Sequence, residues 1–349
     1  MADIKVGLIG YGMAARVFHA PVIQAVPQLQ LKTIVERHRN ESSKDYPEVE
    51  VVRDAAALLQ DQAIDLVVIT TPNVSHFELT QQFLLAGKHV VVEKPFTTTS
   101  NQAQELIDLA HQKNRVLSVH HNRRWDGDFL TIKQLLDSQL LGRLVEYESH
   151  YDRFRNYLKP NAWKETEGEG TGILFDLGSH LIDQAQVLFG LPEKITADLR
   201  VQRDVGEAID NFELILHYDR LKVTLKGGML VREPCPRFIL HGTKGAFLKY
   251  DYDPQEVALK QGHTPSEPNW GEEPKENWGS LITEVSGLEV EGRVRTLAGC
   301  YPAYYQNIAD AICGQAELEV KPEEARNTIR IIELAYQSSR EQRTVPFSE

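Results

Sequence analysis

The sequence predicts an α/β protein in which a doubly wound parallel sheet precedes a second α/β domain with an open, mostly antiparallel sheet. Three observations support this fold class. A glycine-rich turn follows the first apolar run, apolar runs alternate with helical segments through the first third of the chain, and single apolar residues alternate with polar ones from residue 144 onward. Because 349 residues are too many for one ordinary core, we expect two domains, over residues 1–121 and 122–349.

The composition excludes two classes of partner. The net charge of -12 at pH 7 is spread along the chain without a basic stripe, so nucleic acids and anionic membranes are poor partners. No apolar run approaches the length of a bilayer span. Cys235, Cys300 and Cys313 are odd in number and lack metal-ligand spacing, which is typical of reduced thiols in a cytoplasmic protein.

The first motif joins a predicted strand to a helix through glycines. The apolar run Lys5–Ile9 leads into a G-x-G-x-x-G/A turn made of Gly10, Tyr11, Gly12, Met13, Ala14 and Ala15. Gly10 permits the tight turn, Gly12 lets the backbone approach a pyrophosphate, and Ala15 allows close packing of helix on strand. Free amides at the helix start suit the phosphates. Glycines also end strands for local reasons, and it is the following strand–helix alternation that favours a dinucleotide-binding Rossmann domain.

The second predicted strand, Leu29–Val35, bears on the choice of cofactor. It ends at Glu36, where nucleotide-binding units place the acid that accepts hydrogen bonds from the adenosine ribose. This carboxylate favours NAD, because it would repel the 2′-phosphate of NADP. Arg37, His38 and Arg39 follow directly and could instead hold that phosphate, or form a charged loop without a ligand. The expected cofactor is NAD or NADP, with a slight preference for NAD.

Another predicted strand, Asp65–Thr70, ends in polar side chains. Thr71, Pro72 and Asn73 follow it, and they have the chemistry to touch the nicotinamide ribose or the diphosphate. His76 lies in the first turn of the next helix, where a histidine is as often structural as functional.

The strand Val90–Val92 carries the residues on which the functional interpretation depends. Three β-branched residues in a row are typical of a buried central strand, and Glu93, Lys94 and Pro95 follow at its carboxyl end. A lysine held at a partly desolvated strand end loses its proton more easily than one in water, which suits it to act on a substrate hydroxyl. The alternative is a solvated lysine after a strand.

After the sixth predicted strand, Val116–His120, comes a basic and aromatic segment. Asn122, Arg123, Arg124 and Trp125 could clamp a polyhydroxy or anionic ligand or the cofactor phosphates. The two arginines could equally form salt bridges with the Asp126–Asp128 region.

The second half contains alternating strands and two late helices. We expect a strand at Leu144–His150, a hairpin that turns at Asp219–Arg220, and further strands at 195–203, 237–241 and 246–249. Residues 301–313 and 322–336 have helical patterns. The segment 251–279, rich in proline, glycine and acid, is expected to be a long surface excursion.

Between the strand-rich stretches lies a segment with acid/base chemistry. Helical spacing puts Asp176 and His180 one turn apart on the same side, with Asp183 following. A carboxylate beside an imidazole fixes its tautomer and raises its basicity, as proton transfer requires. A helix whose histidine bonds its own turn is one alternative. A metal site is the other, but no further ligand lies nearby in sequence, and we expect no metal.

Together these stretches resemble the Gfo/Idh/MocA oxidoreductases, the glucose–fructose oxidoreductase and inositol dehydrogenase family. Gly10 to Ala15, Glu93-Lys94-Pro95 and Asp176-x-x-x-His180 stand in the family's order and approximate spacing across the whole chain. Three further segments resemble the subgroup that contains NADP-dependent scyllo-inositol dehydrogenase: 121–125, 147–150 and 163–165.

The resemblance implies reversible hydride transfer between nicotinamide and a secondary alcohol carbon of an inositol, sugar or related polyol. It implies that Lys94 polarises the reacting hydroxyl, that His180 is the acid/base, and that Asp176 orients His180 and holds a neighbouring hydroxyl. Arg123, Tyr151 and Trp163 are expected beside the substrate. A homodimer or homotetramer, formed through the open sheet, is also implied. The sequence departs from the subgroup at Glu36, the acid expected with NAD.

Two other functions are compatible with the sequence. An NAD-dependent glycosidase of the same fold would oxidise and re-reduce its substrate on a tightly held cofactor, without net formation of reduced nicotinamide. A non-catalytic NAD(P)-binding sensor or scaffold would depend on Gly12 but not on Lys94 or His180.

Overall fold

The computed structural model of the chain describes residues 4–159 and 163–348. It separates into two compact units, each of which is described by itself. The first comprises Met1–Trp125, Pro254–Gly271 and Cys300–Arg326, and the second comprises Asp126–Asp253, Glu272–Gly299 and Asn327–Glu349. Two segments from the second half of the sequence therefore belong to the first unit.

The first unit is built on a parallel sheet of six strands, which confirms the predicted doubly wound fold. The sheet order is β3-β2-β1-β4-β5-β6, with every neighbouring pair parallel. The strands are β1 (Ile4–Ile9), β2 (Leu29–Val35), β3 (Glu50–Val52), β4 (Leu66–Ile69), β5 (His89–Val92) and β6 (Leu117–Val119). The order reverses direction between β1 and β4, which is where such sheets bind ligands beyond the carboxyl ends of their strands.

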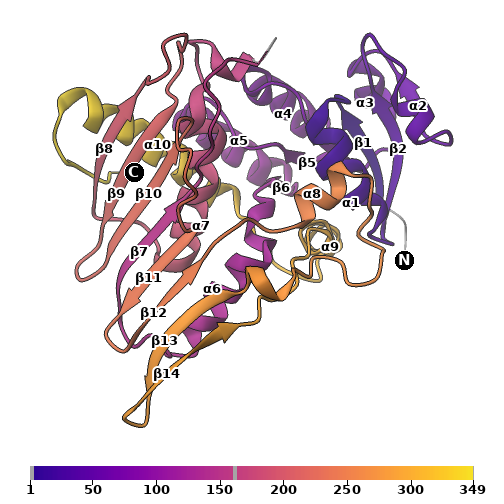
Figure 1. Ribbon diagram of the computed structural model, residues 1–349. Helices are drawn as coiled ribbons and strands as arrows, with labels where there is room; N and C mark the ends of the chain where they lie inside the picture. The colour runs from indigo at the N-terminus through magenta and orange to yellow at the C-terminus, as the bar shows by residue number, and fades with distance from the viewer. Residues whose placement is uncertain (1–3, 160–162, 349) are drawn as a thin grey trace. The chain divides into compact units, whose positions relative to one another are not determined.

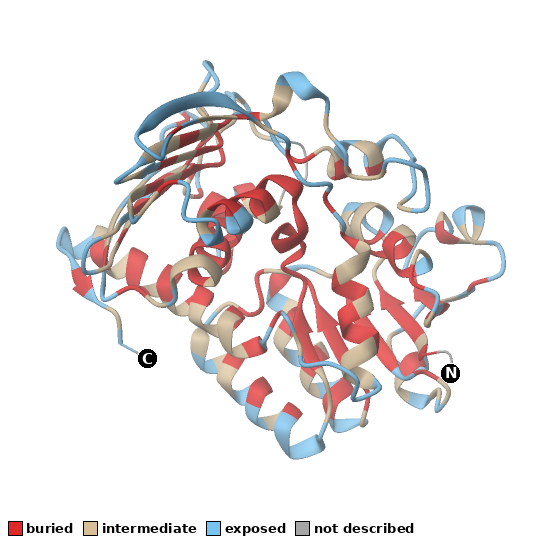
Figure 2. Cartoon of the chain, turned by 90° about the horizontal axis from the view of Figure 1, so that it is seen from below, coloured by how far each residue is buried: buried red, intermediate tan, exposed pale blue. Residues whose placement is uncertain are grey.

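Burial explains why the central strands have continuous apolar sequences. Every residue of β4 is buried, as are Val90, Val91 and Val92 of β5, and Figure 2 shows these strands as the buried centre of the sheet. The helices between the strands are α1 (Ala20–Gln24), preceded by the π-helical turn η1 (Ala15–His19), then α2 (Ser42–Asp45), α3 (Ala56–Gln60), the short η2 (Asn73–Ser75) with α4 (His76–Leu85), α5 (Ser100–Lys113) and η3 (Asn122–Trp125).

The two late segments join the first unit through its core. Leu259 of α8 (Gln255–Lys260) and Tyr301, Tyr304 and Ile308 in and before α9 (Pro302–Ile312) belong to one buried cluster with β1. The expectation that 251–279 is a long surface excursion was therefore wrong for residues 255–260, because α8 buries Leu259 in the core of the first unit. Helix α9 matches the helix predicted over 301–313.

The second unit contains a nine-stranded mixed sheet, mostly antiparallel as predicted. Its order is β14-β13-β12-β11-β7-β10-β9-β8-β15, and β7 and β10 form its parallel pair. The strands are β7 (Leu144–His150), β8 (Lys194–Arg200), β9 (Asn211–His217), β10 (Lys222–Gly228), β11 (Phe238–Gly242), β12 (Gly245–Lys249), β13 (Gly279–Val285), β14 (Leu288–Val294) and β15 (Val345–Pro346). The predicted hairpin is β9–β10, whose residues pair from Lys222 with His217 to Gly228 with Asn211.

One face of this sheet carries the core of the second unit. Phe212, Leu214 and Leu216 of β9 and Val223 and Leu225 of β10 are buried, as the alternation predicted. The unit also contains α6 (Gly127–Asp137), the short η4 (Trp163–Glu165), the π-helical turn η5 (Leu174–Gly178) with α7 (Ser179–Phe189), the short η6 (Lys275–Asn277), and all but the start of α10 (Pro322–Glu341). Figure 1 shows α7 and α10 against the sheet, where Ser338 of α10 accepts a hydrogen bond from the backbone of Ala197.

Within the described residues, no helix combines the length and hydrophobicity that a bilayer crossing requires.

Candidate active site

The glycine turn after β1 leaves space for a phosphate group. Gly10 has φ 93° and donates its N–H to the carbonyl of Val35 at 3.0 Å, and a Cβ there would lie 3.0 Å from Thr70 Oγ1. No heavy atom lies within 4 Å of a Cβ built on Gly12. The backbone at Gly12 is thus open to an approaching group, as the binding of a pyrophosphate over this turn requires. The residues at this turn therefore fit a dinucleotide.

A pocket of about 490 Å³ lies beside this turn within the first unit. Tyr11, Gly12, Met13 and Arg16 line it from the turn and η1, and Arg39 lines it from the loop after β2. The segment after α8 contributes Lys260 and His263, which the sequence analysis missed. No local pattern marks these two residues, since they lie more than 200 residues from the glycine turn.

The carboxylate of Glu36 is turned into its own loop. Its Oε1 accepts the N–H of Glu41 at 3.0 Å, and its Oε2 accepts the N–H of Ser42 at 3.0 Å and the hydroxyl of Ser42 at 2.6 Å. Burial alone would raise the pKa of Glu36, but these hydrogen bonds and Arg53 outweigh it and lower the pKa. Glu36 therefore braces the loop from residue 37 to residue 42. Within this loop, Arg39 lines the pocket and Arg37 does not.

Residues after β4 connect this strand to the turn after β5. Thr71 shares a hydrogen bond with Ser75 at 2.7 Å. The ring of His76, which is fully buried, lies 2.9 Å from the carbonyl oxygens of both Thr71 and Pro95. Burial lowers the pKa of His76. These contacts make His76 a bridge between two strand ends; Asn73, also predicted at the cofactor, is buried at the start of η2.

Glu93 is the centre of a buried group that we call the Glu93 cluster: Glu93, His19, His120 and Tyr305. Its Oε1 lies 2.7 Å from His19 Nε2 and 3.2 Å from His120 Nδ1, and Tyr305 Oη lies 2.5 Å from His19 Nδ1. Burial would raise the pKa of Glu93, but the hydrogen bonds from the two histidines hold it well below its usual range. Burial raises the pKa of Tyr305, and the ring of His19 joins this hydroxyl to the Glu93 carboxylate, which accepts from Nε2.

The Glu93 cluster fixes the backbone at Lys94. The second carboxylate oxygen of Glu93 accepts the N–H of Lys94 at 2.9 Å, and a cis peptide bond joins Lys94 to Pro95. Lys94 itself is half-buried, as expected for a lysine at the carboxyl end of β5. The contact of Glu93 with a cofactor remains a prediction.

The basic segment after β6 is buried as η3. Arg123 forms an ion pair with Glu256 and donates to Tyr301 Oη at 3.0 Å, and Arg124 pairs with Glu324 at 2.8 Å. These pairs tie α8, the residue before α9 and the start of α10 to the parallel sheet, and salt bridges of the arginines with the Asp126–Asp128 region stay a prediction. Asn122 is also buried there.

In the second unit, His180 lies at the start of α7, directly after the η5 turn that contains Asp176. His180 is buried and stacks on Tyr151, with ring centroids 6.4 Å apart and an angle of 27° between the planes. Asp176 Oδ1 accepts a hydrogen bond from Lys164 at 2.6 Å. The π-helical turn replaces the regular helical spacing that was predicted across Asp176 and His180.

Aromatic and basic groups complete this part of the second unit. Tyr252 lies 5.0 Å from Tyr151 between ring centroids, Arg237 lies 5.0 Å above the ring of Tyr151, and Lys164 lies 5.6 Å above that of Trp163. Glu165 anchors the segment through Arg155 at 2.6 Å and Arg203 at 3.1 Å. Sequence analysis missed Lys164, Arg237 and Tyr252 as candidates, although Lys164 stands within a segment that it singled out.

The sequence and the fold both match known proteins. Residues 4–121 match the model of the GFO_IDH_MocA oxidoreductase family with an NAD-binding Rossmann fold, and residues 133–347 match that family's C-terminal alpha/beta domain. The chain is 45% identical to the oxidoreductase YdgJ of Escherichia coli (strain K12), over 98% of both chains. It is 42% identical to scyllo-inositol 2-dehydrogenase (NADP(+)) IolW of Bacillus subtilis (strain 168), over 98% of this chain and 95% of IolW.

A solved structure agrees with these relatives. The yvaA protein from Bacillus subtilis, in its triclinic form, superposes with a TM-score of 0.96 at 41% identity, over 99% of both chains. The glycine turn, the strand-end Lys94 and the Asp176–His180 segment thus stand in a chain that matches the family in sequence and in fold throughout. This chain belongs to the Gfo/Idh/MocA family of NAD(P)-binding oxidoreductases.

Proposed function

We propose that the chain is an NAD(P)-dependent dehydrogenase that transfers hydride between nicotinamide and a secondary alcohol carbon of an inositol, sugar or related polyol. The observation that carries this is the common edge formed by β1, β4 and β5, which are neighbours in the parallel sheet. The glycine turn follows the carboxyl end of β1, Thr71 to Asn73 follow that of β4, and Lys94 follows that of β5. The similarity to a scyllo-inositol 2-dehydrogenase supports the substrate class.

In this proposal the protein supplies binding, orientation and proton transfer. The turn at Gly10 and Gly12 holds the pyrophosphate, and bound nicotinamide supplies the hydride acceptor or donor. Lys94, whose backbone the Glu93 cluster fixes, polarises the reacting hydroxyl. His180 takes or returns the hydroxyl proton, and its stacking on Tyr151 limits the orientations of the ring. Asp176 and its partner Lys164 hold a neighbouring hydroxyl, and Arg123, Tyr151 and Trp163 are proposed at the substrate.

We further propose that the enzyme prefers NADP. Both oxygens of Glu36 accept hydrogen bonds from the loop 41–42, so this carboxylate braces its own loop, and less of its acceptor capacity is left for a ribose hydroxyl. Arg39 and Lys260 line the pocket beside the glycine turn, together with the acids Glu41 and Asp45, and the two cations offer positive charge to a 2′-phosphate.

Binding measurements test the cofactor preference. Arg39→Ala should weaken NADPH binding by roughly 10 to 100-fold, the equivalent of one charge-assisted hydrogen bond, and leave NADH binding unchanged. Arg37→Ala, a neighbouring arginine outside the pocket lining, is the matched control. Equal effects of the two substitutions, or tighter binding of NADH than of NADPH by the wild type, would overturn this part of the proposal.

A screen of inositols, aldoses and polyols with NAD and NADP separately tests the reaction. We expect reduced nicotinamide to accumulate with at least one substrate, and Lys94→Met to lower turnover by about 10² to 10⁴-fold without changing cofactor affinity. Lys113→Met, an exposed lysine on α5, is the control. Turnover without net reduced nicotinamide would indicate the glycosidase instead. The homodimer or homotetramer stays a prediction, and the molar mass measured by light scattering tests it.

A further inference from the structure

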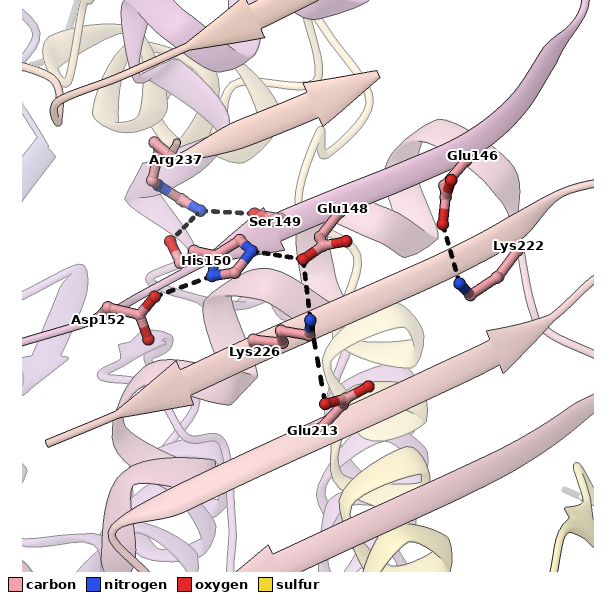
Figure 3. A network of polar contacts seen from close by, with 9 residues as sticks. All are labelled: Glu146, Glu148, Ser149, His150, Asp152, Glu213, Lys222, Lys226 and Arg237. Atoms are coloured by element: carbon pink, nitrogen blue, oxygen red, sulfur yellow. Dashed lines mark hydrogen bonds and ion pairs between the residues drawn. The ribbon is translucent and has the colours of Figure 1, made fainter. Parts of the chain in front are cut away.

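The end of β7 carries a polar group on the sheet face opposite to the core. Tyr147 and Ser149 are fully buried, and the alternating residues Glu148 and His150 project from the other face, where Asp152 joins them beyond the strand end (Figure 3). None of these three polar residues has a role in the proposed dehydrogenase reaction.

The two ring nitrogens of His150 face different carboxylates. Nε2 lies 2.7 Å from Glu148 Oε1, and Nδ1 lies 2.8 Å from Asp152 Oδ2. Glu148 is in turn held by Lys226, whose ammonium lies 3.0 Å away (Figure 3). The imidazole is thus fixed through Nε2 by a carboxylate that is itself oriented, while Nδ1 is aimed at a second carboxylate.

Cys235 adds a sulfur donor to this group. It lies between Pro234 and Pro236 in the connection from β10 to β11, and its thiol is free. One ligand atom from each of His150, Asp152 and Cys235 lies within 4.8 Å of the other two. His150 and Asp152 are two residues apart, but Cys235 lies more than 80 residues further along the chain, so sequence spacing could not reveal the group.

We propose that His150 Nδ1, Asp152 and Cys235 bind a zinc-class divalent cation, with the fourth position open to water. A nitrogen, an oxygen and a sulfur donor match the ligands that Zn²⁺ takes in tetrahedral sites. Glu148 meets the further requirement of such sites, since a ligating histidine usually donates its other N–H to a carboxylate. The cation takes the place of the thiol proton and of any proton shared between His150 Nδ1 and Asp152, and these protons are released to solvent.

The geometry requires a small adjustment. Zinc–ligand bonds of about 2.0 to 2.3 Å in a tetrahedral arrangement place the donors roughly 3 to 4 Å apart. His150 Nδ1 and Asp152 Oδ2, now 2.8 Å apart, therefore have to separate slightly as Asp152 exchanges its hydrogen bond with Nδ1 for the cation, and the sulfur of Cys235 has to lie within about 4 Å of both. The bound ion would join the end of β7 to the β10–β11 connection and stabilise the second unit.

The Glu93 cluster is a poorer candidate among the described residues. It offers two histidines and one carboxylate, but no sulfur, and its atoms are already joined by hydrogen bonds in a fully buried setting. Its contacts are those of a closed polar network, whereas the site at Cys235 is reached from solvent.

The test uses the full-length untagged protein, stripped with chelator and titrated with Co²⁺ and with Zn²⁺ against a chromophoric chelator. We expect one equivalent of metal per chain, a thiolate-to-cobalt charge-transfer band, and a higher melting temperature with Zn²⁺. Cys235→Ser should abolish the band. Glu148→Gln should keep it but weaken Zn²⁺ binding by about 10 to 100-fold, because the orienting carboxylate is lost.

Cys300→Ser and Cys313→Ser are matched controls, since both cysteines are also free and exposed. They should leave the band and the affinity unchanged. Absence of the band in the wild type, its persistence in Cys235→Ser, or its equal loss in either control would overturn the proposal. Circular dichroism of each variant, together with the retained band in Glu148→Gln, separates loss of the site from misfolding.

Discussion

Glu93→Gln tests whether the Glu93 cluster holds the site-bearing turn in place. The carboxylate accepts from three donors, namely His19, His120 and the N–H of Lys94, using both of its oxygens. An amide of the same size has one oxygen, so at least one buried donor loses its acceptor. Each such loss costs about 1 to 3 kcal/mol, and the free energy of unfolding should fall by at least that amount at pH 7.

The same substitution has a defined pH dependence. The pKa of Glu93 is well below its usual value in the folded protein, so its contribution is present above the unfolded pKa and is lost as pH falls through the folded one. The difference between wild type and variant should therefore be constant near neutral pH and shrink below about pH 4.5.

Urea unfolding, followed by circular dichroism from neutral to acidic pH, measures both effects. Glu105→Gln, an exposed residue on α5 in the same unit, is the matched control and should change stability by less than about 0.5 kcal/mol. A loss in Glu93→Gln no larger than that of the control, or one that does not vary with pH, would refute the account of the Glu93 cluster.

Three further predictions concern stability and cofactor binding. Burial, and then the neighbouring His19, lower the pKa of His120 to about 4, so the free energy of unfolding should decline from pH 6.5 toward pH 4 as the unfolded chain takes up a proton. In His120→Asn this decline should be about 3 kcal/mol smaller. An unchanged dependence on pH would contradict this prediction. Arg203→Met removes the cation that pairs with the buried Asp210 and should lower the free energy of unfolding in urea by about 3 to 5 kcal/mol. Arg200→Met, whose ion pair with Asp198 is exposed, should lower it little. Equal losses in the two variants would argue against a role for burial. Gly12→Val should abolish NADPH binding, measured by fluorescence, because a side chain there blocks the approach of the pyrophosphate. The melting temperature should not fall, since the side chain fills open space in the free protein. Retained binding would show that the cofactor does not cross this turn.

The parallel sheet could be predicted because its sequence signals are local. Buried parallel strands read as continuous apolar runs, as in Val90–Val92, and each run ends in a turn whose residues suit a ligand. The β9–β10 hairpin was predictable for a related reason, since one buried face imposes strict alternation.

The β13–β14 hairpin was not predicted, because its sequence carries no such constraint. Almost every residue of β14 is exposed, so no core dictates where its apolar residues stand. The one local signal is the turn, where Ser286 and Gly287 both have positive φ, as a type I′ hairpin turn requires.

The positions of the candidate site residues could be predicted, but their partners could not. Lys94 stands at the strand end where the apolar run placed it. The pairing of Glu93 with His19 and His120, and of Arg123 with Glu256, joins residues far apart in sequence. Periodicity shows which face of an element is buried, but it does not show which charged groups meet there.

Label transfer tests the proposed hydride transfer most directly. The ketone of a polyol found in the screen is incubated with NADPH deuterated at the reactive C4 position, and the product is analysed by mass spectrometry and NMR. The account predicts one deuterium at the new carbinol carbon with the wild type, and almost none in the same time with Lys94→Met. A reduced product without label, or one labelled equally by the variant, would contradict it.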